Sequence, residues 1–222
     1  MYSYMGAAIW MITAYLLGSL PWSIWIGQLF YGVDVRQHGS GNAGATNTFR
    51  VLGRRAGLVV LVLDIAKGMA AVKLGELFGW IFGKESMILL QELRPLAGAC
   101  AILGHVYSVF LHFKGGKGVA TALGVMASLA PWATLSSAGI FILAWLFSGY
   151  ISVSSLSAAL AFPLFHFLFY KEVSLIQWTL VVGCSLFIFY THRSNIRRLL
   201  KGEESKMPLF KKVVKKPKEK IC

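Results

Sequence analysis

Long runs of apolar residues set the strongest limit on how this chain folds. Six such runs alternate with short polar segments, at residues 5–30, 58–82, 95–113, 119–147, 150–170 and 173–190. Nearly all of them reach the roughly 20 residues that a membrane-spanning helix needs. With 56% hydrophobic and 14% charged residues, the chain is also too apolar for an ordinary soluble domain. We therefore predict an all-α, polytopic integral membrane helix bundle, in which the first run is a retained helix and not a cleaved signal peptide.

Residues 119–147 decide the predicted number of spans. The run is long for one helix and is interrupted at Ala130-Pro131-Trp132. A tight hairpin at Pro131 gives seven transmembrane helices, with the N-terminus outside and the C-terminus in the cytoplasm. A single span over 119–147 gives an even number of spans. The polar segments would then lie on opposite faces of the membrane, or the basic tail would lie outside. A partly re-entrant segment 119–130, shielded by protein, is a third arrangement.

The distribution of basic residues favours seven spans. That arrangement places seventeen of the 22 lysines and arginines in cytoplasmic segments, against only Lys84, Arg94 and Lys171 outside. Such an excess is the positive-inside pattern of membrane proteins. Many of these cations crowd into residues 203–222, which we predict to be a basic, disordered cytoplasmic tail after a single transmembrane domain at 1–202. We expect the tail to meet anionic lipid headgroups and not nucleic acid.

Cysteine and histidine give no sign of a metal site or a cofactor. Two of the three cysteines, Cys100 and Cys184, fall inside predicted spans, and the third, Cys222, is terminal. The histidines lie on different predicted elements and form none of the spacings typical of zinc ligands. We therefore predict no metal, no cofactor and no disulfide framework.

A first polar segment, residues 39–50, combines flexible backbone with hydrogen-bond donors. Its glycines permit positive φ, which brings backbone N–H groups close to an anion. We expect a helix to begin near Ala45 or Thr46, so that its N-terminus points at a phosphate while Arg50 adds a guanidinium. A flexible, capped connection is the plainer alternative. The candidate binding residues of this segment are Ser40, Gly41, Asn42, Thr46, Asn47 and Arg50.

The second polar segment, residues 114–118, superficially resembles a nucleotide-binding loop. It lacks the spacing of that motif, no strand precedes it, and Gly118 replaces the required serine or threonine. Glycine amides and Lys117 at the start of an apolar helix still provide a phosphate site, so Gly115, Gly116 and Lys117 are candidates. The alternative is that Lys114 and Lys117 only anchor the chain at the interface.

The third segment continues the last predicted helix beyond the membrane. His192 and Asn195 are three residues apart, on one helical face, and can therefore act on one ligand. Histidine titrates near neutral pH and serves as a general base or as a hydrogen-bond partner of a hydroxyl. The alternative is that His192 lies at the membrane interface and takes no part in a reaction.

Together, residues 39–50, 104–121 and 192–199 resemble, in order and composition, the three motifs of the bacterial acyl-phosphate:glycerol-3-phosphate acyltransferases. The resemblance covers essentially the whole chain and includes Asp64 to Gly68. It departs at Tyr107-Ser108, where the family commonly has Phe-Pro. It implies transfer of a fatty acyl group from acyl phosphate to the 1-hydroxyl of glycerol 3-phosphate, at the cytoplasmic face of a bacterial inner membrane.

The motifs assign roles to the candidate residues. We expect Ser40, Arg50, Lys117, His192 and Asn195 to form the catalytic pocket for glycerol 3-phosphate. Gly41, Asn42, Thr46, Asn47, Gly115 and Gly116 are expected to bind substrate, mainly around the acyl phosphate head. Acyl phosphate has a good leaving group, so no acyl-enzyme is required. The acceptor proton passes to His192 or to the phosphate of the donor, and we favour the phosphate.

Two other functions fit parts of the pattern. A membrane carrier of phosphorylated metabolites also needs basic, amide-rich loops, but carriers commonly show internal repeats and midplane ligand groups, and neither is found in this sequence. A membrane scaffold with lipid-binding loops is the other alternative. Of the three hypotheses, only the enzyme predicts that the purified protein turns over substrate.

Overall fold

The computed structural model describes residues 2–82 and 84–207, and every regular element in this part of the chain is a helix. The prediction of an all-α chain is thus confirmed. The α-helices are α1 (Tyr2–Ser19), α2 (Trp22–Tyr31), α3 (Ala45–Leu52), α4 (Arg54–Phe82), α5 (Lys84–Val106), α6 (Val119–Leu129), α7 (Pro131–Ser148), α8 (Ile151–Phe169), α9 (Leu175–Thr191) and α10 (Arg193–Leu200), with two short 3₁₀ turns, η1 (Val35–Gln37) and η2 (Val109–Leu111).

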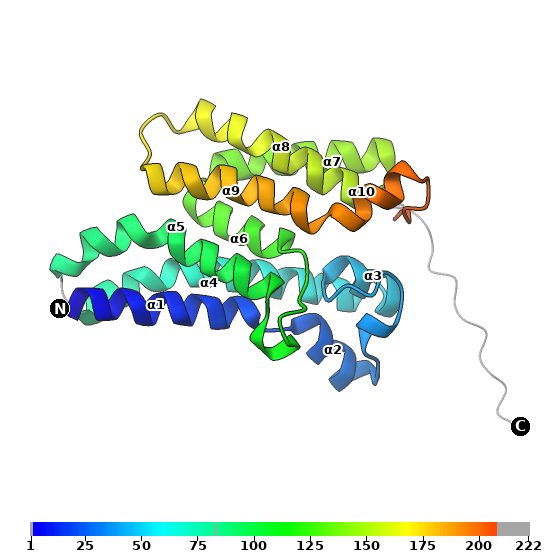
Figure 1. Ribbon diagram of the computed structural model, residues 1–222, viewed down its shortest axis with the longest axis horizontal. Helices are drawn as coiled ribbons and strands as arrows, with labels where there is room; N and C mark the ends of the chain where they lie inside the picture. Colours follow the sequence, from blue (N-terminus) through cyan, green and yellow to red (C-terminus); the bar gives the residue numbers. More distant parts are fainter. Residues whose placement is uncertain (1, 83, 208–222) are drawn as a thin grey trace, which may run out of the picture.

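The long helices pack in two layers. Helices α1, α4 and α5 contact one another in the first layer, and α8 contacts both α7 and α9 in the second (Figure 1). Helix α6 joins the layers, because it contacts α4, α5 and α7. The short helices α2, α3 and α10 lie together at the end of the bundle opposite the start of α1 (Figure 1).

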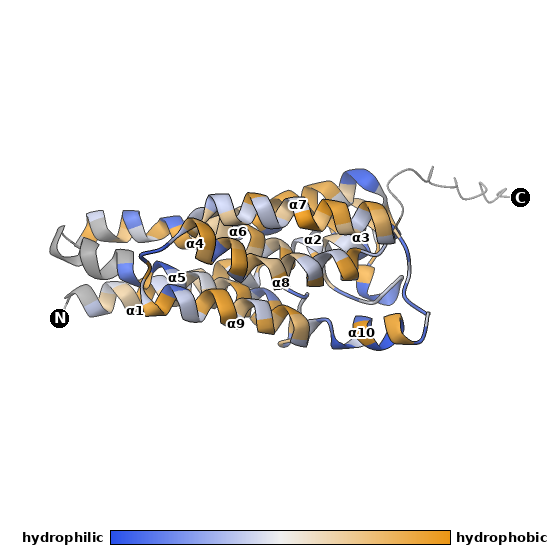
Figure 2. Ribbon diagram, turned by 90° about the horizontal axis from the view of Figure 1, so that it is seen from above, coloured by the Kyte–Doolittle hydropathy of each residue, from blue (hydrophilic) through white to orange (hydrophobic). Residues whose placement is uncertain are grey.

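Apolar residues predominate along the long helices, while hydrophilic residues gather near α3 and α10 (Figure 2). In the described part of the chain, three helical segments are long and apolar enough to cross a membrane: Glu92–Leu111, Pro131–Ser148 and Ile151–Phe169. The number rises to five if each of two bent helix pairs is one span. Helix α6 is an apolar helix too short for this criterion. The seven-span topology therefore stays a prediction.

Two of the apolar runs are broken between helices, and the chain bends again just after a third run. The break expected at Ala130-Pro131 is present, with Pro131 as the first residue of α7, where its missing N–H costs nothing. Run 5–30, expected to be one helix, instead bends by 42° before α2, because Pro21 cannot donate the backbone hydrogen bond that would continue α1. The chain also bends by 53° between α9 and α10, so the third polar segment does not continue the last helix straight.

Candidate active site

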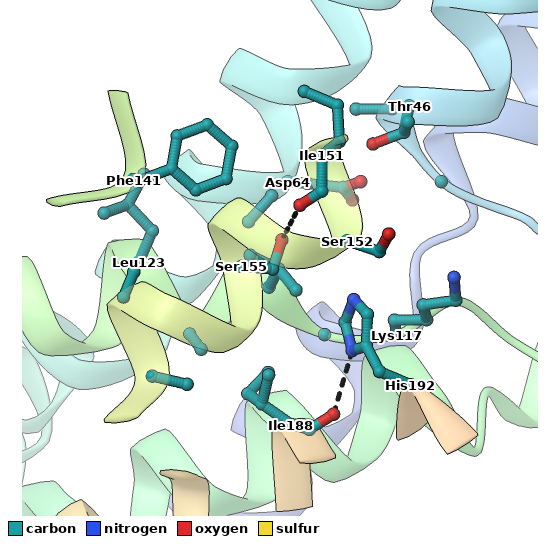
Figure 3. A pocket seen from close by; sticks show the side chains of 18 of the residues that line it. Thr46, Asp64, Lys117, Leu123, Phe141, Ile151, Ser152, Ser155, Ile188 and His192 are labelled. Atoms are coloured by element: carbon teal, nitrogen blue, oxygen red, sulfur yellow. Dashed lines mark hydrogen bonds between the residues drawn. The ribbon is translucent and has the colours of Figure 1, made fainter. Parts of the chain in front are cut away.

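The three polar segments, far apart in sequence, meet at a cavity of about 410 Å³. Its polar end is formed by the loop before α3, the start of α6, the start of α8 and the junction of α9 with α10. Its apolar end extends between α6, α7, α8 and α9. Figure 3 shows Lys117, Ser152 and His192 near one another, with Leu123 and Phe141 farther along the cavity. A charged recess and an apolar chamber are therefore continuous.

Asn47 builds the loop of the first polar segment. Its Oδ1 accepts a hydrogen bond from the Ser40 amide at 2.8 Å, and its Nδ2 donates to the carbonyls of Val35 at 2.7 Å and His38 at 3.1 Å. The side chain is only 1% exposed. Gly39 has a φ of +62°, and a Cβ there would lie 2.4 Å from Asn47 Oδ1. These contacts hold the Ser40 side chain on the cavity.

Arg50 follows on α3, which begins at Ala45 as expected. One Nη donates to the carbonyl of Ser205 at 3.0 Å. The Nε is buried and has no hydrogen-bond partner among the described residues. Burial, partly opposed by the nearby Glu204 carboxylate, lowers the pKa of Arg50. The guanidinium thus retains a free donor beside the cavity, which an anionic ligand can use.

The glycines of the second polar segment do not cradle the cavity as expected. The amide of Gly115 donates to Val106 O at 2.9 Å, and that of Gly116 donates to His105 O at 3.1 Å. These carbonyls are at the C-terminal end of α5, where the helix itself supplies no partner. A Cβ on Gly115 would lie 2.0 Å from His105 O. The two glycines permit a close approach of the loop to α5 and leave Lys117 to face the cavity.

Lys117 is the buried cation of the site. Its Nζ donates to Oδ1 of Asn195. Burial lowers the pKa of Lys117 to about 8, the Glu204 carboxylate raises it, and the cations Arg198 and Arg50 lower it further. The ammonium is therefore charged at neutral pH and loses its proton just above it.

His192 lies at the junction of α9 and α10, outside the apolar part of α9. Its Nδ1 is 2.8 Å from the carbonyl of Ile188 (Figure 3). Since a carbonyl only accepts, Nδ1 carries the proton and Nε2 is left as an acceptor. Burial, reinforced by the charge of Lys117, lowers the pKa of His192 to about 4. The ring is thus neutral at physiological pH.

Glu204 was not predicted as a site residue. Its Oε1 accepts from Ser152 Oγ at 2.9 Å and from Asn195 Nδ2 at 2.6 Å, and its Oε2 accepts from Arg198 Nε at 2.7 Å. Burial raises the pKa of Glu204, but these hydrogen bonds outweigh it and the pKa is lowered. The carboxylate fixes the Asn195 amide so that Oδ1 points to Lys117. No local pattern signalled this contact, because Glu204 stands in a charged segment.

The segment after α10 therefore differs from the predicted tail. Residues 203–207 pack on the helices: Met207 N donates to Gly149 O at 2.8 Å, and Trp145 Nε1 donates to Met207 O at 2.7 Å. The rest of the predicted tail, 208–222, lies outside the described residues.

A buried charged cluster supports the other side of the site. Lys67 Nζ lies 2.8 Å from Asp64 Oδ1, which is 3.6 Å from His105 Nδ1. The same Nζ donates to Leu20 O at the bend between α1 and α2, at 2.9 Å. The cluster ties α4 to that bend and to α5. Among the described residues, no group of three or more His, Cys, Asp or Glu side chains is arranged to hold a metal ion.

Comparison with known proteins identifies the family. The family model described as glycerol-3-phosphate acyltransferase matches residues 8–202. The chain belongs to this acyltransferase family. A glycerol-3-phosphate acyltransferase of Fusobacterium nucleatum is 41% identical over 88% of this chain and 95% of its own length. One of Geobacillus kaustophilus is 43% identical, with coverages of 90% and 95%.

Solved structures of the family share the fold. The glycerol 3-phosphate form of PlsY, described as an integral membrane glycerol 3-phosphate acyltransferase, matches with a TM-score of 0.80 and 38% identity over 90% of this chain and 95% of that one. A lysophosphatidic acid form matches with a TM-score of 0.77 and 36% identity, covering 90% and 94%. The integral membrane fold predicted from the apolar runs is thereby confirmed.

In this member of the acyltransferase family, most of the predicted site residues meet at one cavity. Those that line it are Ser40, Asn42, Thr46, Asn47, Arg50, Lys117, His192 and Asn195. Gly41, Gly115 and Gly116 are not among its lining residues. Gly41 has a φ of +70° and shapes the turn after His38, whose carbonyl accepts its amide hydrogen. Sequence reasoning missed Glu204, which accepts a hydrogen bond from Asn195, and Ser152, which donates to Glu204.

Proposed function

We propose that this protein transfers a fatty acyl group from acyl phosphate to the 1-hydroxyl of glycerol 3-phosphate, forming lysophosphatidic acid and phosphate. One observation carries the proposal: a single cavity joins a recess with two cations to an apolar chamber inside the helix bundle. Both substrates carry phosphate and one carries an alkyl chain, so the two parts of the cavity match the two parts of the reactants.

The glycerol 3-phosphate pocket is assigned to Ser40, Arg50, Lys117, His192 and Asn195. Lys117 and the Nε of Arg50, which has no partner in the described part of the chain, supply charge-assisted hydrogen bonds to the phosphate. The first residues of α3 and α6, which lack side-chain caps, face the same cavity. Their unpaired N–H groups and helix dipoles attract the second phosphate, that of the donor. Asn42 and Thr46 lie beside that position, while Asn47 shapes the loop around it.

The reaction requires no acyl-enzyme. The 1-hydroxyl oxygen attacks the acyl carbonyl carbon, the bond from that carbon to the phosphate oxygen breaks, and the hydroxyl proton passes to the departing phosphate. Acyl ester and hydrogen phosphate are then the products, and all atoms and charges balance. His192 accepts a hydrogen bond from the hydroxyl through Nε2 and orients it. The cations and helix N-termini stabilise charge on the phosphate as it leaves.

We propose that the site lies at the cytoplasmic face of a bacterial inner membrane. Most of the chain's basic residues belong to segments at the α3–α10 end of the bundle or to the tail that follows them, as the positive-inside pattern requires. That face also gives access to a water-soluble acceptor, while the apolar chamber receives the donor's chain from the bilayer.

The test is phosphate release by purified protein in detergent, with acyl phosphate as donor and with or without glycerol 3-phosphate. We expect release that depends on the acceptor, together with formation of lysophosphatidic acid. The Lys117→Ala variant should lose about a hundredfold or more in kcat/KM. Lys114→Ala is the matched control, since Lys114 belongs to the same segment but does not line the cavity. A folded preparation without acceptor-dependent release would refute the proposal.

A further inference from the structure

The cavity has a definite inner end. Helices α6 and α8 begin at the polar recess, whereas α7 and α9 end there. On α6 and α8, the lining residue farthest from the recess is therefore the last one in sequence. On α7 and α9, it is the first one in sequence. These residues are Met126, Thr134, Phe162 and Val181, and all four are buried.

The depth of the whole cavity, from the polar recess to its inner end, is close to the thickness of one leaflet of a membrane. On α8, the lining residues extend from Ile151 to Phe162, and on α9 they extend from His192 back to Val181. At 1.5 Å per helical residue, each stretch is about 16 Å long. The hydrocarbon core of a bilayer is about 30 Å thick, so one leaflet is about half of that. A cavity of this depth takes the phosphate head in the recess and the acyl chain in the chamber beyond it.

After Ile151 at the start of α8, Phe162 is the first large side chain of that helix that lines the cavity. The lining residues before it on that helix include Ser152, Ser155, Ala158 and Ala159, which leave room beside the helix. Phe162 is 7% exposed and belongs to the buried core that also contains Met126 and Val181. The ring therefore closes the chamber with a packed wall.

We propose that Phe162 sets the longest acyl chain that the enzyme accepts efficiently. The inference rests on the proposed function, because it assumes that the chain of the acyl donor fills the apolar chamber. Each further methylene packs against the walls of the chamber and strengthens binding through dispersion contacts, until the chain reaches the Phe162 ring. Further methylenes then meet the Phe162 ring and must bend back or remain outside. A smaller residue at 162 deepens the chamber, and a larger one at 159 shortens it.

The experiment measures kcat/KM for saturated acyl phosphates that differ in length by two carbons, with glycerol 3-phosphate as acceptor. For wild type we expect kcat/KM to rise with length and then to fall. Phe162→Leu and Phe162→Ala should move the maximum to longer chains by one member of the series or more. Ala159→Leu should move it to shorter chains. Phe167→Leu is the matched control, because Phe167 is on the same helix but 65% exposed and outside the cavity.

The shortest donor provides the internal control for folding, because it does not reach residue 159 or 162 and should be used equally by all variants. Ala159→Leu keeps the test decisive if Phe162→Ala does not fold. An unchanged maximum in Phe162→Leu and Ala159→Leu would overturn the inference. That result is expected if the chain leaves the chamber sideways past Ile142, a lining residue that is 51% exposed. Wild-type protein that uses no acyl phosphate at all would overturn the proposed function as well.

Discussion

At the scale of single residues, the site depends on how its buried charges are balanced. Lys117 is held next to Asn195, and the Glu204 carboxylate is joined to the other end of the same amide. Asn195 Nδ2 can only donate and Oδ1 can only accept, so Glu204 determines which end of the amide faces Lys117. Glu204 acts through Asn195 as a positioning residue and contributes negative charge that keeps Lys117 protonated.

The pKa of Lys117, about 8, predicts an alkaline limit to activity. Below that pH the ammonium is charged and binds phosphate, and above it the charge is lost. We expect kcat/KM for glycerol 3-phosphate to fall up to tenfold per pH unit above about pH 8. The measurement is a pH profile at saturating acyl phosphate.

Two variants distinguish this cause of the alkaline limit from a general loss of structure. Lys117→Arg keeps its charge, so its residual activity should lack the limit. Glu204→Gln removes the carboxylate that raises the pKa of Lys117, so its limit should move to lower pH. An identical limit in all three proteins would contradict the assignment.

His192 should bind the acceptor without setting the pH profile. Its pKa of about 4 leaves the ring neutral from pH 5 upward. His192→Ala removes one hydrogen bond to the acceptor, so the KM for glycerol 3-phosphate should rise about tenfold. The shape of the profile between pH 5.5 and 7.5 should stay the same. A limb near neutrality in wild type that disappears in His192→Ala would show that the ring, and not the donor's phosphate, takes the proton.

At the scale of helices, the position of the site depends on close packing of α4 and α6. A Cβ on Gly124 would lie 2.0 Å from Ile65 O, and one on Gly68 would lie 2.3 Å from Thr121 O. Small residues allow such close helix contacts, which replace the hydrophobic effect that is missing within a membrane. Helix α6 starts just after Lys117, and α4 carries Asp64, so the contact sets the relative position of the two sides of the cavity.

Gly124→Val should therefore push α6 away from α4. We expect lower thermal stability in detergent and at least tenfold lower kcat/KM at every acceptor concentration. Gly139→Val on α7 is the matched control, since a Cβ there has no neighbour within 4 Å. The control should keep its activity within about twofold. Equal behaviour of the two variants would show that the α4–α6 contact does not position the site.

Local sequence signals predicted the helices and the three segments of the site, but not which hydrogen-bond partners the backbone groups have. The starts of α3 and α6 and the break before Pro131 follow from glycine and proline, which act within a few residues. A glycine amide looks the same in sequence whether it meets a phosphate or, like Gly116, a carbonyl at the end of the preceding α-helix. Glu204 also bonds Ser152, which is 52 positions away in the sequence. Only the packed bundle reveals these contacts.

At the scale of the whole molecule, the charge distribution predicts how the bundle sits in the membrane. The polar recess, α3 and α10 share one end, and the turn that holds Lys171 between α8 and α9 is at the other. From the positive-inside pattern we predict that the first end lies in the cytoplasm. Seven spans, with α6 counted as one of them, bring the N-terminus outside and the C-terminus inside.

Cysteine labelling tests this orientation. In a protein whose own cysteines are replaced by serine or alanine, Lys171→Cys should react with a membrane-impermeant maleimide in intact spheroplasts. Lys201→Cys, just after α10, should react only after the membrane is opened. Both residues are exposed basic positions at helix ends, so they differ mainly in the side of the membrane that they face. Labelling of Lys201→Cys in intact spheroplasts would put the anionic acceptor's site on the outer face and would contradict both the seven-span topology and a cytoplasmic supply of substrate.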